Sequence, residues 1–104
     1  MRGWIAYRFV SPIIIHSKEG GLTWNSRKLV DMMLSEDYRE RFRAEYHQLV
    51  NRANKLRKML RAQAKGELKF KPKCTTDLLT WQLKTMDEYI YILKRRAEVE
   101  GIEL

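Results

Sequence analysis

Residues 37–66 read DYRERFRAEYHQLVNRANKLRKMLRAQAKG, and this stretch decides the fold. Apolar residues recur in it at intervals of three or four, namely Tyr38, Phe42, Tyr46, Leu49, Ala53, Leu56 and Leu60. Such spacing places them on one face of an α-helix. Asp37, with Glu40 three residues later, has the form of a capping box, and Gly66 is typical of the position just past a helix end. The stretch therefore predicts one long helix over residues 38–65.

A second long helix is predicted after a short, basic loop. The loop holds Phe70 between two lysines. The helix begins near Thr75 or Thr76, ends at Gly101, and carries along its expected inner face Leu79, Gln82, Met86, Tyr89, Leu93 and Arg96, with Ile90 and Ala97 beside them. Two long helices joined by so short a loop pack as an antiparallel hairpin. The predicted fold class is therefore mostly α.

The first third of the chain has a different pattern. Aromatic and β-branched residues are dense between residues 2 and 15, which predicts one strand or two short strands. Trp24–Leu34 has helical spacing and predicts a short helix. We therefore divide the chain into an N-terminal extension, residues 1–36, of short β or irregular segments and a short helix, and a helical hairpin domain, residues 37–104.

The charge of the chain is concentrated in one region. The 104 residues carry a net charge of +8, and residues 51–73 hold nine Lys or Arg against one acid, Glu67. The rest of the chain is neutral, so an anionic partner is drawn to this region. Two long helices packed only on each other also leave apolar surface unburied, so the protein is expected to assemble as a homo-oligomer.

Several classes of protein are disfavoured by the sequence. The single cysteine, Cys74, cannot form an intramolecular disulfide, which fits a reducing, cytoplasmic compartment. The most apolar stretch, Trp4–Ile15, is too short to span a membrane. His16 and His47 are the only histidines, and no zinc spacing, catalytic triad, phosphate loop or dinucleotide motif is present. We therefore expect a binding protein without enzymatic activity or cofactor.

Three features are candidates for binding an anionic ligand. The basic residues around Arg57 form either a solvated helix face or a phosphate site. Phe70, flanked by lysines, either stacks on a nucleobase or tucks under the loop as an apolar plug. Gln82 and Arg96 occupy positions where apolar residues are expected, so each faces a partner or a cleft.

Two stretches of the hairpin resemble a known family. One begins as DYRERF at residues 37–42 and continues through Glu45, Leu49 and Lys55-Leu56. The other is more specific and fixes Leu78-Leu79, Gln82, Met86, Tyr89, Leu93 and Arg96, followed by Glu100-Gly101-Ile102. The segment from Asp37 to Leu104 thereby resembles the small phage helical-hairpin proteins that include the sponges of anti-CBASS and anti-Thoeris counter-defence.

The resemblance implies a function and a set of site residues. Such sponges bind cyclic nucleotide immune signals in the infected bacterial cell without cleaving them. They form oligomers, often hexamers, with pockets between subunits. Arg96 lies on the shared motif, which implies that it contacts the ligand. Phe70 and Lys71 suit a base and a phosphate, Arg43 lies near Arg96 if the hairpin is antiparallel, and Arg57 completes the predicted ligand-binding set.

Other readings of the residues remain open. The basic region also suits a nucleic-acid backbone, with affinity that falls steeply as salt rises. The hairpin face also suits a host protein, in which case no nucleotide is bound. Residues 1–36, which the plainer hairpins lack, either brace the assembly as strands or lie upstream of a start at Met32 or Met33.

Overall fold

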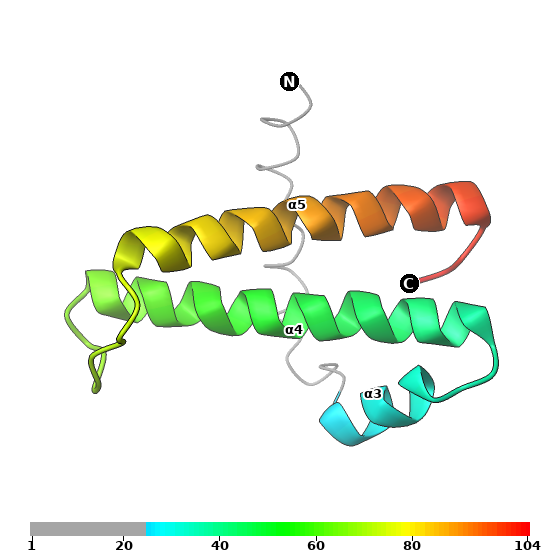
Figure 1. The fold of residues 1–104 in the computed structure, drawn as a ribbon, viewed down its shortest axis with the longest axis horizontal. Coiled ribbons are helices and arrows are strands. Elements are labelled where there is room, and N and C mark those ends of the chain that lie inside the picture. The colour runs from blue at the N-terminus through cyan, green and yellow to red at the C-terminus, as the bar shows by residue number, and fades with distance from the viewer. Residues whose placement is uncertain (1–24) are drawn as a thin grey trace.

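The computed structural model describes residues 25–104, which form three helices and, within that range, no strands. These are α3 (Ser26–Met33), α4 (Tyr38–Ala64) and α5 (Thr76–Glu100). In Figure 1, α4 and α5 lie side by side and run in opposite directions, and α3 lies against the first half of α4 on the side away from α5. The predicted mostly helical fold is confirmed, whereas the strands predicted over residues 2–15 lie outside the described residues.

The helix ends follow from the residues that occupy them. The Asp37 carboxylate accepts a hydrogen bond from the Arg39 backbone N–H at 2.9 Å and so caps α4. A capping box also requires the Glu40 carboxylate to accept a hydrogen bond from the Asp37 N–H. Here the Asp37 N–H donates to the Ser35 hydroxyl instead, at 3.0 Å. Thr75 caps α5 in the same way, accepting from the Leu78 N–H at 3.1 Å.

Glycines stop both long helices, as the sequence predicts. Gly66 has a φ of 73°, and the next residue, Glu67, donates its N–H to the Ala62 carbonyl at 2.8 Å. Gly101 has a φ of 70°, and Ile102 donates to Ala97 at 2.9 Å. These bonds satisfy carbonyls that a helix end leaves without partners, and the left-handed backbone suits glycine. The second turn also folds Ile102 back onto the core.

The core occupies one end of the hairpin. Its buried residues come from the first half of α4 and from the second half of α5 with the tail, and they are Phe42, Tyr46, Val50, Ala53, Ile90, Leu93, Ala97 and Ile102. Leu56 and Leu60, in the half of α4 near the loop, are only half-buried. Each helix buries only the row of side chains that faces the other helix, so the remaining side chains of the loop half stay exposed to solvent.

Two further features complete the description of the fold. Leu29 is buried where α3 contacts α4, and this contact adds a third helix to the first half of the hairpin. Among the helices of residues 25–104, none has an apolar run long enough to cross a bilayer.

The position of the core predicts unequal effects for the same substitution. Leu93 is 1% exposed and Leu34 is 78% exposed. Leu93→Ala should lower the free energy of unfolding by about 2–5 kcal/mol, because it leaves a cavity between α4 and α5. Leu34→Ala should change it by less than about 0.5 kcal/mol. Urea unfolding followed by circular dichroism measures both, and equal losses would show that the core is misplaced.

Candidate functional site

The five residues predicted to bind ligand do not meet within one chain. Arg43 is near the start of α4 and Arg96 is near the end of α5, at one end of the hairpin, whereas Phe70 and Lys71 lie in the loop at the other end. The 27 residues of α4 separate these ends by about 40 Å. A single pocket that holds all of them therefore requires residues from more than one copy.

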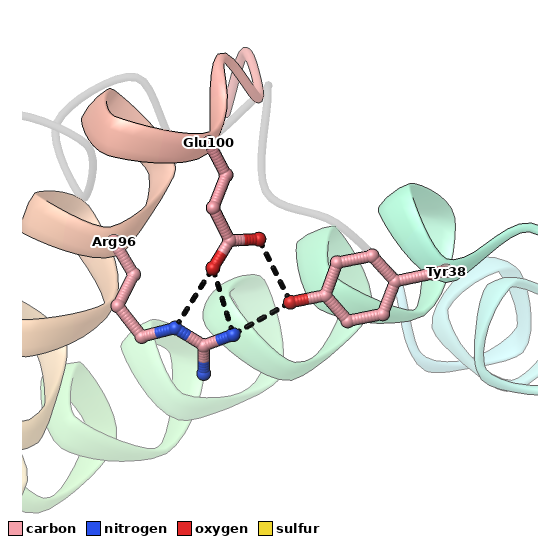
Figure 2. A network of polar contacts seen from close by, with 3 residues as sticks. All are labelled: Tyr38, Arg96 and Glu100. Atoms are coloured by element: carbon pink, nitrogen blue, oxygen red, sulfur yellow. Dashed lines mark hydrogen bonds and ion pairs between the residues drawn. The ribbon is translucent and has the colours of Figure 1, made fainter.

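Arg96 is held by a polar network at the open end of the hairpin. Its guanidinium donates from Nε and Nη2 to Glu100 Oε2 at 3.1 and 2.9 Å, and from Nη2 to the Tyr38 hydroxyl at 2.6 Å (Figure 2). The Tyr38 hydroxyl in turn donates to Glu100 Oε1 at 2.9 Å. The guanidinium also lies over the Phe42 ring, 5.1 Å from its centroid. The network ties the start of α4 to the end of α5.

The same network sets the ionisation of its members. The hydrogen bonds from Tyr38 and Arg96 stabilise the Glu100 carboxylate and lower its pKa below the ordinary value of 4.5. The bond that Tyr38 donates to this carboxylate raises the pKa of the phenol. The Arg96 side chain is still 48% exposed, so a ligand phosphate can approach it, but the Glu100 carboxylate competes for the same donors.

The other two predicted arginines also have partners inside the chain. Arg43 Nε donates to the Glu103 carbonyl at 2.6 Å and fastens the C-terminal tail to α4. Arg57 forms a bidentate ion pair with Asp87 of α5, at 2.9 and 3.2 Å. Both side chains of this pair are largely shielded from water, so Arg57 joins the two helices rather than facing a solvated surface.

The loop residues are the predicted site members that the structure leaves most accessible. Phe70 is 59% exposed, so it is not the apolar plug that the sequence allowed as an alternative. Lys71 beside it is also exposed. An exposed aromatic next to a lysine can stack on a base while the ammonium group meets a phosphate.

A groove with polar walls runs along α4 and α5 from the middle of the hairpin toward the loop, and Ser26 at the start of α3 also lines it. It encloses about 430 Å³, the size of a typical small-molecule site. Its lining combines cations, amides, a hydroxyl, thioethers and a leucine: Ser26, Gln48, Asn51, Arg52, Lys55, Leu56, Met59, Gln82 and Met86. The sequence predicted that Gln82 faces a partner or a cleft, and the structure places it at this cleft.

An apolar groove adjoins the polar groove along α5. It encloses about 520 Å³ and is lined by Leu78, Trp81, Gln82, Thr85, Met86 and Tyr89. Gln82 and Met86 of α5 line both grooves and so mark the boundary between them. Trp81, which is 67% exposed, is not among the site residues predicted from the sequence. Its spacing of three from Leu78 and four from Thr85 would have placed all three on one outward face.

Some of the residues that carry the family resemblance line these grooves. Leu78, Gln82, Met86 and Tyr89 do so, whereas Leu93 lies in the core and Arg96 lies at the other end of the hairpin. The model of the Sequestin family matches residues 36–99, which cover α4, the loop and nearly all of α5. The chain belongs to the Sequestin family. Sequestin corresponds to the phage cyclic-nucleotide sponges, so the resemblance drawn from the sequence is confirmed. Neither a curated protein nor a solved structure matches this sequestin.

The Glu100 network predicts a loss of stability in acid. Because the pKa of Glu100 is lower in the folded chain than its ordinary value of 4.5, its stabilising contribution is complete above that pH. The contribution is lost as the pH falls from there through the folded pKa. The difference in free energy of unfolding between the wild type and Glu100→Gln should therefore shrink as the pH is lowered from 7 to 3.

Urea unfolding at a series of pH values measures this difference. Glu98→Gln is the matched control, because the Glu98 ion pair with Arg95 is exposed and should be worth less than about 1 kcal/mol. A difference for Glu100→Gln that stays constant across the series would contradict the network.

Proposed function

We propose that this sequestin binds and holds cyclic nucleotide immune signals in the infected bacterial cell and does not cleave them. The signals are the cyclic oligonucleotides of CBASS or the cyclic ADP-ribose isomers of Thoeris. The observation that carries the proposal is the position of four family-motif residues of α5, namely Leu78, Gln82, Met86 and Tyr89, at two adjoining grooves. One groove offers cations and amides and the other offers apolar surface, and a nucleotide needs both.

Tight binding is required because the protein must compete with a host effector for a scarce signal. Nanomolar affinity corresponds to about −12 kcal/mol. Two or three charge-assisted contacts at about 1.5–3 kcal/mol each do not reach this value. Base stacking and a desolvated pocket must contribute the rest, and the proposal assigns the stacking to the exposed aromatic side chains of Phe70 and Trp81.

We also propose that the protein works as a homo-oligomer in which a second copy covers the outer face of α5. Five residues of this face follow one stripe at spacings of 3, 4, 7 and 7, and they are Leu78, Trp81, Thr85, Ile92 and Val99. The stripe points away from α4, and its large apolar members are exposed, Val99 by 82%. Apolar residues that repeat at alternating intervals of three and four form the contact line between paired helices.

The charges within the stripe favour a copy that runs antiparallel. Glu88 and Arg95 occupy the two stripe positions left between the apolar residues, seven residues apart. When two identical stripes meet about a two-fold axis perpendicular to the helices, Glu88 of each copy faces Arg95 of the other, and the overlap covers Thr85, Ile92 and Val99. Leu78 and Trp81 lie beyond the end of the partner helix in this register. Like charges would meet in a parallel pair in register. The resemblance predicts six copies in all, a number that an assembly of such pairs can reach.

The proposed interface predicts a loss of assembly when a charge enters the stripe. Ile92→Glu should dissociate the oligomer into smaller species, because it places a carboxylate in an apolar seam. Thr80→Glu adds the same charge to α5 at an exposed position off the stripe and should leave the assembly intact. Light scattering after size exclusion gives both masses. A wild type that elutes as a monomer would rule out the interface.

The sequestering function is tested by calorimetric titration of the full chain at physiological salt. The panel contains cyclic di-GMP, cyclic GMP-AMP, cyclic tri-AMP and cyclic ADP-ribose isomers. One class should bind saturably with a dissociation constant near or below about 100 nM. Heating the complex should release the ligand chemically unchanged, as chromatography can establish.

Two outcomes would contradict this function. Recovery of a hydrolysed product would show that the protein is an enzyme. An absence of heat across the panel would exclude these signals, and affinity for DNA or RNA that falls steeply with salt would then indicate a nucleic-acid binder attracted by the basic region.

A further inference from the structure

The cations of the hairpin divide into two groups by what they contact. Arg43, Arg57 and Arg96, the three arginines chosen from the sequence, each donate hydrogen bonds to oxygens of their own chain. Arg52 and Lys55 make no hydrogen bond or ion pair with any residue of the part of the chain that the structure describes. Both are exposed, and both line the polar groove.

Arg52 and Lys55 are placed to act on one anion together. They are three residues apart on α4, so their side chains leave the same face of the helix and reach toward the same stretch of groove. Two cations on one face attract a phosphate more strongly than either does alone, and an arginine can bind it through two parallel hydrogen bonds. Their mutual repulsion is relieved when the anion binds.

The remaining walls of the groove suit a nucleobase. Gln48 lies one turn before Arg52 on α4, and Gln82 enters from α5. Neither amide has a hydrogen-bond partner among residues 25–104, so each can donate to and accept from the polar edge of a base. Met59 and Met86 add polarisable sulfur atoms, which make favourable contacts with aromatic rings.

We propose that the polar groove binds one nucleotide unit of the ligand, with its phosphate group at Arg52 and Lys55 and its base edge at Gln48 and Gln82. This assignment rests on the proposed function and locates it within the chain. It moves the phosphate contact from the arginines bonded within the chain to the two cations of the groove, which have no such partner among residues 25–104. Substitution at these two positions therefore leaves the internal contacts of the hairpin intact.

The assignment is tested with the panel member that the wild type binds. Arg52→Gln and Lys55→Gln should each weaken binding by about tenfold or more, the usual effect of losing a charge-assisted hydrogen bond. Lys58→Gln removes an exposed cation of α4 that does not line the groove, and it should change the affinity by less than about twofold. Thermal unfolding of all three variants should match the wild type.

Gln82→Leu tests the proposed base contact in the same groove independently of the phosphate contact. It should change the ratio of affinities for cyclic di-GMP and cyclic di-AMP, because an amide that reads a base edge discriminates between bases. A purely structural role for Gln82 would lower both affinities equally.

The two proposals fail in distinguishable ways. If the wild type binds a panel member and both Arg52→Gln and Lys55→Gln bind it equally well, the groove assignment is wrong and the sequestering function stands. If the wild type binds no panel member, the function is wrong, and the groove assignment falls with it.

Discussion

The packing of α4 against α5 along a single stripe is the constraint on which the rest of the structure depends. Two helices can bury only the residues that face each other, and here that shared surface is filled at one end by Phe42, Tyr46, Ile90 and Leu93. At the other end the facing residues are only half-buried. The grooves begin at the middle of the hairpin and extend toward that end, where α3 reaches only Ser26 of the polar groove and does not line the apolar one. The same constraint leaves the outer face of α5 exposed, which is why a second copy is expected to lie against it.

The arginines show how a helical hairpin of this size divides its charges between structure and binding. A guanidinium with five donors can bind a carboxylate or a carbonyl as readily as a phosphate. Arg57 joins the helices through Asp87, and Arg96 closes the open end through Glu100 and Tyr38. These contacts hold the hairpin without a disulfide and with a small core. Apart from Arg57, the cations of the basic region, residues 51–73, form no ion pair with residues 25–104, since the excess positive charge is concentrated there. The region that attracts an anion from solution therefore also holds most of the cations that can bind it.

Much of the fold was predictable because its signals are local. The interval of three and four between apolar residues, the Asp37 and Thr75 caps and the two glycines each act within a few residues, and both long helices begin and end within a residue or two of the predicted positions. The short helix α3 was predicted from spacing in the same way. The degree of burial along the predicted faces was not predictable. Tyr38 and Leu56 have the same helical spacing as Phe42, but only Phe42 has neighbours on every side.

The sequence by itself determined the helical class of the fold, the ends of its helices, the location of its charge and its family. All of these depend on residue types and on their separation along the chain. Only the tertiary structure decided which charged and aromatic side chains are available to a ligand. An arginine has the same chemistry at residues 52, 57 and 96, and its availability depends on whether an acid lies beside it, as Glu100 of the same helix does for Arg96 and Asp87 of the other helix does for Arg57. That acid is 30 residues away from Arg57 in the chain, so the pairing arises from the antiparallel packing and from the register that the core imposes. The grooves have the same origin, since Gln48 and Gln82 become neighbours only when the hairpin closes.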